Sequence, residues 1–91
     1  MMTDREMLEL AAKAAGYDAK WIGEPFMVLG DGEYWWPLRD DTDAFRLAAK
    51  LGITVDWGTS PVSSYAALQE RLEMTRRGIV KAAAKIGSKM K

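Results

Sequence analysis

The sequence of 91 residues contains no cysteine and no histidine. Structural zinc sites are built mainly from these two residue types, and thiol nucleophiles, imidazole bases and Ser-His-Asp triads require them as well. Catalysis would have to use carboxylate pairs, a lysine, a tyrosine or a divalent metal held by carboxylates. We therefore expect a protein that is not an enzyme, carries no metal or cofactor, and acts by binding.

Long hydrophobic runs are absent too. No apolar run approaches the roughly 18 residues that a membrane span requires. Asp4, Glu6 and Glu9 occupy the region in which a secretory signal carries basic residues and then an apolar core. The lack of cysteine fits a reducing compartment. These features predict a cytoplasmic protein that makes no membrane contact.

Neither sign of charge dominates the chain, but the charges are unevenly distributed. Thirteen basic and thirteen acidic residues give a net charge of zero. Residues 1–57 contain 11 acidic and 6 basic side chains, whereas residues 58–91 contain 2 acidic and 7 basic ones. The basic segment either neutralises the acidic one within the fold or leaves a bipolar surface for a charged partner. The length and the 48% hydrophobic content indicate a single globular domain over 1–91.

Two short helices are indicated by their ends as well as by their apolar spacing. Thr3 and Glu6 form a capping-box pattern before the apolar-periodic segment 4–15, and a glycine follows that segment. The acidic segment 40–43 is suited to cap a second helix, because carboxylates accept the free amides of a first turn. We expect one helix over 4–15 and another between this acidic segment and Gly52.

Segments with a two-residue period predict four strands. Residues 17–22 alternate between apolar and charged side chains, and 53–57 alternate in the same way. Residues 26–29 and 33–36 flank Gly30-Asp31-Gly32, which can supply the positive φ of a tight hairpin. Pro37 is expected to end the third strand.

The remainder of the chain, from about Ser63, has a helical pattern. Apolar residues follow three-four spacing from Tyr65 to Met90. One helix of up to about 26 residues fits, as do two helices broken near Gly78, and a single helix would protrude from a domain of this size. The predicted fold is α+β: a small antiparallel or mixed sheet of about four strands with helices packed on it, ending in a long C-terminal helix.

Tyr34-Trp35-Trp36 is the main aromatic candidate for binding. Neighbouring side chains of a strand point to opposite faces, so the two tryptophans cannot enter the same core layer. Both are buried if helices cover both faces of the sheet. If one face is open, Trp36, or Tyr34 together with Trp36, lies on it and could stack a base or anchor a protein partner.

A basic stripe is the second candidate. Arg77, Lys81, Lys85 and Lys89 are spaced by four and so share one side of a helix, with Arg76 beside them. Such a stripe can follow phosphates, or it can be a solvated face that meets the acidic segment. The sequence pI of about 6.2 is low for a dedicated DNA-binding protein.

Two further patterns have simpler structural explanations. Asp40, Asp41 and Asp43 could hold Mg²⁺ or Ca²⁺, but the cluster lacks the glycine and glutamate of an EF-hand loop, and helix capping accounts for it. Gly30-Asp31-Gly32 lacks the GxxxxGK pattern of a phosphate-binding loop and is better explained as a turn. We expect no metal site at either place.

Segments 43–53 (DAFRLAAKLGI) and 76–84 (RRGIVKAAA) resemble a group of short bacteriophage proteins, the phage ABA-sandwich domain and its relatives, and 4–12 (DREMLELAA) fits as well. That group shares an N-terminal helix, a tryptophan-rich middle, a helix with Arg-Leu-Ala, a strand and a final Arg/Ala-rich helix. This chain departs from it over 58–75, where helix replaces strand-like sequence. The resemblance implies a phage or prophage accessory gene acting in the bacterial host cytoplasm, and it implies no activity or catalytic residue.

The favoured hypothesis is a non-catalytic phage accessory protein that binds a host protein, for example to inhibit a host or defence component. The alternatives are a protein that binds or sequesters a nucleotide, a nucleic-acid-binding protein that uses the basic C-terminal helix, and a weak metal-dependent hydrolase that uses the 40–43 carboxylates. The candidate contact residues are Tyr34, Trp36, Arg76, Arg77, Lys81 and Lys85.

The apolar stripe over 65–90 and the opposite net charges of the two parts of the chain predict a homodimer, because a protruding apolar face needs cover. We expect light scattering on the purified protein to give about twice the chain mass of 10.2 kDa. A mass that stays near 10.2 kDa at high concentration would contradict self-association.

Overall fold

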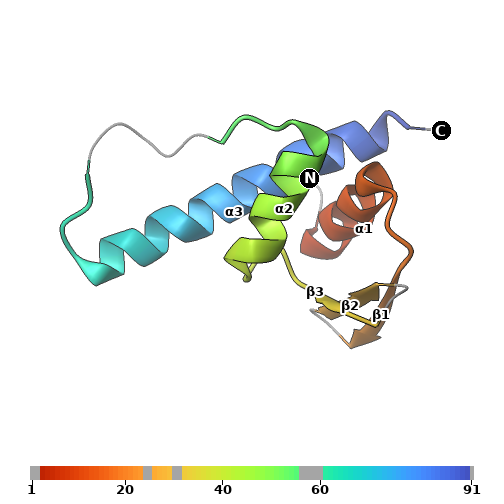
Figure 1. Cartoon of the computed structure of the whole chain (residues 1–91), viewed down its shortest axis with the longest axis horizontal. Coiled ribbons are helices and arrows are strands. Elements are labelled where there is room, and N and C mark those ends of the chain that lie inside the picture. Colours follow the sequence, from red (N-terminus) through yellow and green to blue (C-terminus); the bar gives the residue numbers. More distant parts are fainter. Residues whose placement is uncertain (1–2, 24–25, 30–31, 56–60, 91) are drawn as a thin grey trace.

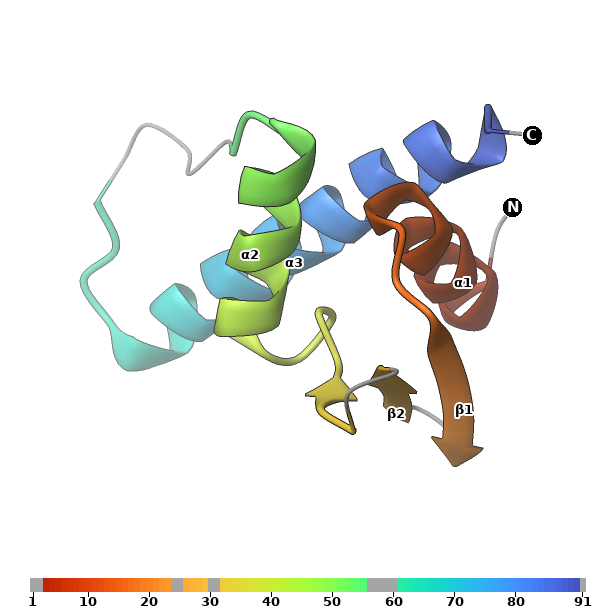
Figure 2. The same ribbon diagram turned by 45° about the vertical axis from the view of Figure 1, so that its right-hand side comes forward.

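The computed structural model describes residues 3–23, 26–29, 32–55 and 61–90. Within these residues the helices are α1 (Asp4–Ala15), α2 (Asp41–Leu51) and α3 (Tyr65–Ser88), and the strands are β1 (Ala19–Gly23), β2 (Phe26–Leu29) and β3 (Tyr34–Trp35). The molecule measures 40 × 26 × 25 Å. The long helix α3 runs along its longest dimension, α1 and α2 lie against α3, and the strands lie beyond α1 (Figures 1 and 2).

The ends of α1 and α2 confirm the helices expected from the sequence. The Thr3 hydroxyl accepts the Glu6 backbone N–H at 3.2 Å, and the Asp40 carboxylate accepts the Asp43 N–H at 3.1 Å. Gly16 and Gly52 follow the two helices with positive φ angles of 74° and 68°, which β-carbon-bearing residues rarely adopt. Local capping therefore determines where both helices begin and end, and these ends lie close to the ends of the apolar periodicity in the sequence.

The chain forms one helix, not two, after residue 64. Ser64 caps α3, which continues for 24 residues through Gly78. None of residues 65–74 is buried, whereas Thr75, Ile79 and Val80 are buried in the second half. The first half of α3 thus extends beyond the part covered by α1 and α2 (Figure 1). The expectation that part of a single long helix protrudes is confirmed.

The core lies where the helices meet, and it is rich in alanine. Leu8, Leu47 and Val80 are its largest fully buried aliphatic side chains. Around them lie short side chains from all three helices: Ala11, Ala12, Ala15, Ala44, Ala48, Ala83 and Ala84. Short side chains let helix backbones approach closely. One such close approach is at Gly87, where an added Cβ would overlap the carbonyl oxygen of Leu10 on α1.

The strands form a small antiparallel sheet in the order β1-β2-β3. In its register Ala19 pairs with Leu29, and Met27 pairs with Trp35. Trp35 is 3% exposed, and its side chain anchors the hairpin to the core. There the Tyr17 ring packs edge-on against it, with 5.6 Å between the ring centroids. The hairpin predicted from 26–29 and 33–36 is therefore present, although Gly30 and Asp31 of its turn lie outside the described residues.

The predicted four-stranded sheet covered by helices is wrong. The described strands are short, and the helices build their core mainly against one another. Residues 53–55 form no strand, and 56–57 of the expected fourth strand lie outside the described residues. Ile53 and Val55 are half-buried and Thr54 is exposed, and all three line a groove beside α3. The alternation of apolar and polar side chains thus reflects packing beside a helix, which buries every second side chain as a sheet would.

Two glycines of α3 provide a matched test of this packing. Gly87→Ala should destabilise the protein by about 1–3 kcal/mol, because the new methyl group has to push α1 away from α3. Gly78→Ala should stabilise it by about 0.5–1 kcal/mol, because a Cβ there meets nothing within 4 Å and alanine favours helix. Urea denaturation followed by circular dichroism measures both. Equal stability of the two variants would contradict the described helix packing.

Candidate binding cleft

The aromatic candidates separate in the structure. Tyr34 is 69% exposed on β3, Trp35 is in the core, and Trp36 is half-buried just after the strand. The backbone N–H of Trp36 donates to Asp43 Oδ2 at 2.9 Å, which ties the end of the hairpin to the first turn of α2. The side chain of Tyr34 is thus exposed to solvent on the hairpin, whereas the backbone of Trp36 is held by Asp43.

The predicted basic stripe also divides. Arg76 is largely buried and donates to the Leu38 carbonyl at 3.1 Å and to Asp41 Oδ1 at 2.6 Å. Arg77 pairs with Asp4, and Lys81 and Lys85 are exposed. Arg76 therefore fastens the start of α2 to α3. Both ion pairs join the acidic first part of the chain to the basic last helix, which is the internal neutralisation considered from the sequence.

A cleft of about 340 Å³ opens between α1, β1, the turn before α2, and α3. We call it the arginine–tryptophan cleft; its lining residues are Asp4, Arg5, Leu8, Trp21, Trp36, Leu38, Arg39, Glu73 and Arg77. It contains two of the sequence-predicted residues, Trp36 and Arg77. Tyr34, Arg76, Lys81 and Lys85 are not among the described residues that line it.

Each tryptophan of the cleft lies beneath an arginine. The Arg5 guanidinium carbon is 4.9 Å from the Trp21 ring centroid, and that of Arg39 is 5.5 Å from the Trp36 ring centroid. At these distances the cations are attracted to the ring faces. Glu9 holds the first pair from the side, since its Oε1 accepts Trp21 Nε1–H at 2.9 Å and Arg5 Nε–H at 3.2 Å. The cleft therefore presents two cation–ring units, of which Glu9 holds the first in place.

Carboxylates at and near the cleft have shifted pKa values with different causes. A hydrogen bond from Arg77 lowers the pKa of Asp4, so this pair stabilises the fold at neutral pH and the contribution is lost as pH falls through the lowered value. Burial raises the pKa of Asp43, and the Trp36 N–H partly opposes the rise. Compared with the unfolded chain, the folded state releases the Asp43 proton less readily. The contribution of this group to stability therefore falls as pH rises from the ordinary pKa of the carboxyl through the raised pKa.

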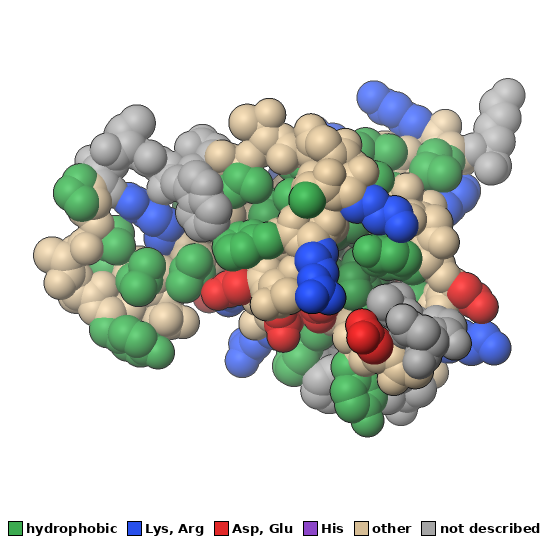
Figure 3. All heavy atoms as spheres, viewed as in Figure 1, with side chains coloured by type: hydrophobic (Ala, Val, Ile, Leu, Met, Phe, Trp, Pro, Cys, Tyr) green, Lys and Arg blue, Asp and Glu red, His purple; other side chains and the backbone are tan. Residues whose placement is uncertain are grey.

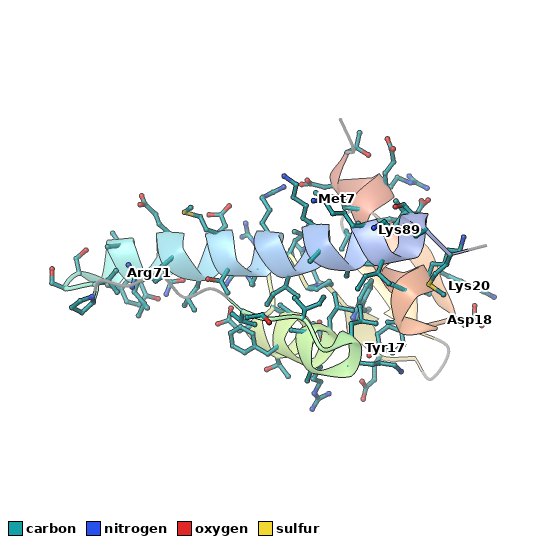
Figure 4. All side chains as sticks on the ribbon, turned by 90° about the horizontal axis from the view of Figure 1, so that it is seen from above. Met7, Tyr17, Asp18, Lys20, Arg71 and Lys89 are labelled. Carbon is teal, nitrogen blue, oxygen red and sulfur yellow. The ribbon has the colours of Figure 1, made fainter. Side chains whose placement is uncertain are left out.

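A second hollow, the apolar groove, lies between the segment that follows α2 and the face of α3 over residues 67–82. It has a volume of about 670 Å³, and Ile53, Val55, Val62 and Met74 contribute to its lining. Hydrophobic side chains also gather on the end of α3 that extends beyond the helix junction (Figure 3). Figure 4 labels Arg71 on this extending part and Lys89 beside α1 at the opposite end. The predicted homodimer would use this face, and it stays a prediction.

Neither a group of metal-binding side chains nor a membrane-spanning helix is found in the part of the chain that the structure describes. No three acidic side chains among those residues gather to hold a metal ion. Of the three aspartates at the start of α2, Asp40 caps the helix as expected, whereas the Asp43 carboxylate accepts the Trp36 N–H and the Asp41 carboxylate pairs with Arg76. No described helix is long and apolar enough to cross a membrane.

Comparison with protein-family models, curated proteins and solved structures finds no match. The resemblance to short phage proteins therefore stays an expectation from the sequence, and the cleft has to be interpreted from its own chemistry.

Sequence reasoning missed most of the cleft, including three of its arginines and tryptophans, Arg5, Trp21 and Arg39, and the partner of Arg77, Asp4. Arg5 and Arg39 are isolated basic residues in an acidic part of the chain, and Trp21 stands in an ordinary alternating strand. Only the tertiary fold brings them beside Trp36 and Arg77. A local signal does exist for one pair, because Arg39 follows Trp36 by three residues across a turn.

The two neighbouring arginines of α3 should differ in their effect on stability. Arg76→Gln should destabilise by about 1–3 kcal/mol, because it removes a largely buried charge that satisfies Leu38 and Asp41. Arg77→Gln should cost less than about 1 kcal/mol, because its ion pair is exposed. Thermal unfolding at neutral pH measures both. A larger loss for Arg77→Gln would show that the assignment of Arg76 as the structural residue is wrong.

Proposed function

We propose that this protein is not a catalyst and that it binds another protein through the arginine–tryptophan cleft. The observation that supports this proposal is that two cation–ring units and the exposed Arg77 open into one cleft. Tryptophan and arginine are the residue types that dominate binding energy at protein interfaces, because they combine large contact area with directional hydrogen bonds. The buried side chains of Leu8 and Leu38 form an apolar floor beneath the same cleft.

The biological setting that we propose is a phage or prophage accessory gene whose product inhibits a host or defence component in the bacterial cytoplasm. Support for this setting comes from the sequence resemblance of segments 43–53 and 76–84, and from the lack of thiol and imidazole groups. The setting names no particular partner.

Nucleotide binding is the second candidate. The cleft volume of about 340 Å³ is within the range of small-molecule sites, and its arginines could contact phosphate while a base stacks on tryptophan. A nucleotide at about 100 times its dissociation constant should then stabilise the protein by roughly 2.7 kcal/mol in a thermal-shift assay. A flat response to a nucleotide panel removes this candidate.

Nucleic-acid binding has less support from the geometry. Arg76 and Arg77 are engaged in ion pairs, which leaves the exposed Lys81 and Lys85 to follow phosphates. Such binding would weaken steeply as salt is raised.

A charge reversal in the cleft tests the proposed function. Arg39→Glu should weaken partner capture at least about tenfold, roughly 1.4 kcal/mol, because it removes one cation–ring unit and places a carboxylate beside Trp36. The measurement is affinity capture from a bacterial lysate with quantitative mass spectrometry, followed by titration of the captured protein. Circular dichroism confirms that the variant is folded.

The matched control is Arg46→Glu, which makes the same charge change at an exposed arginine of α2 outside the cleft. It should leave capture unchanged. Lys81→Glu combined with Lys85→Glu tests the rest of the basic stripe. Loss of capture in that double variant, with full capture by Arg39→Glu, would contradict the cleft as the binding site.

A further inference from the structure

Arg77 already holds a carboxylate at the edge of the arginine–tryptophan cleft. Its Nη1–H donates to Asp4 Oδ1 at 2.8 Å, and its Nη2–H donates to Asp4 Oδ2 at 3.4 Å. This is the two-point arrangement in which a planar guanidinium recognises a carboxylate. The free protein thus shows how the cleft can bind an acidic group.

The Arg77–Asp4 pair is open to exchange. The two side chains are 48% and 58% exposed, so a carboxylate from outside can reach the guanidinium. Exposed ion pairs contribute little to stability, and α1 is fixed on α3 by its buried face and by the close approach at Gly87. An incoming carboxylate can therefore displace the Asp4 side chain from Arg77 and leave the packing of α1 on α3 intact.

The charges around Arg77 favour a singly charged group over a multiply charged one. Three arginines line the cleft, but Asp4 and Glu73 line it as well. If Asp4 is displaced by an incoming group, its own charge stays nearby and Glu73 stays in place. Both groups would be repelled by these two negative charges, but a phosphate dianion carries twice the charge of a carboxylate and is repelled about twice as strongly, whereas a carboxylate brings the single charge that Arg77 already pairs with.

We propose that the cleft binds an aspartate or glutamate side chain of the partner protein, and that Asp4 occupies the place of this side chain in the free protein. The proposal rests on the proposed function and names the chemistry of its partner. The acidic side chain pairs with Arg77, and apolar neighbours in the partner segment contact Trp21 and Trp36. Asp4 acts as an internal competitor, so its removal strengthens binding.

The test uses a defined probe, the acetylated and amidated peptide Gly-Leu-Glu-Leu-Gly, with Gly-Leu-Gln-Leu-Gly for comparison. Titration is followed by nuclear magnetic resonance of the Trp21 and Trp36 indole N–H groups and the Arg77 side-chain N–H. The glutamate peptide should shift these resonances saturably and the glutamine peptide should not. Asp4→Asn should bind the glutamate peptide at least threefold more tightly, and Arg77→Gln should lose the saturable shifts.

Asp18→Asn is the matched control, because it makes the same chemical change at an exposed aspartate between α1 and β1 (Figure 4). It should bind the peptide as the unaltered protein does. Unchanged or weaker binding by Asp4→Asn would overturn the proposal, as would absence of peptide binding in every variant. Tighter binding of inorganic phosphate than of the glutamate peptide at the same resonances would also overturn it.

The experiments distinguish failure of this proposal from failure of the proposed function. If capture of the partner still depends on Arg39 while Asp4→Asn fails to strengthen peptide binding, only the acidic side chain as ligand is wrong. If capture is insensitive to Arg39 as well, the cleft is not the binding site and the proposed function is also wrong.

Discussion

The close contact between α1 and α3 is the constraint on which the rest of the structure depends. It is possible because Gly87 has no side chain where α3 meets the backbone of Leu10, and because both helices present alanine to each other. A small protein buries little surface, so its stability depends on dense packing of what it does bury. Short side chains achieve that density here by bringing two backbones together.

That contact also places the functional groups. Asp4 and Arg5 lie in the first turn of α1, and Arg77 lies on the part of α3 that faces this turn. Trp35 anchors the hairpin in the core, and the turn that follows it holds Trp36 and Arg39 at the same opening. The cleft therefore forms at a junction of four chain segments, none of which carries a binding motif by itself.

The helices could be predicted from the sequence because their signals are local. A cap within three residues and a terminal glycine determine where α1 and α2 begin and end, and they do not depend on the rest of the fold. The hairpin could be predicted for a similar reason, because two glycines stand close together between its two apolar segments in the sequence. The fourth strand was a wrong prediction because alternation at Ile53, Thr54 and Val55 records only which side is covered, and a helix can cover it as well as a strand.

The binding site was less accessible to sequence reasoning. Spacing by four correctly placed the basic residues of α3 along one helix. It could not show that the Arg76 guanidinium would bind the Leu38 carbonyl and the Asp41 carboxylate. It could not show either that Arg5 and Trp21 would line one cleft with Arg77, because that depends on how α1 crosses α3. Tertiary contacts of this kind produce no periodic pattern in the sequence from which they could be predicted.

The two halves of α3 have different surroundings, and this has a consequence for how the helix opens. Residues 65–74 have no buried member, whereas the half from Thr75 onward is covered by α1 and α2. Amide protons in the first half should therefore exchange with deuterium through local fraying, while those around Val80 and Ala83 should exchange only when the whole domain unfolds. A single unbroken helix in this protein thus contains two segments of very different burial, and the boundary between them lies next to Arg76 and Arg77.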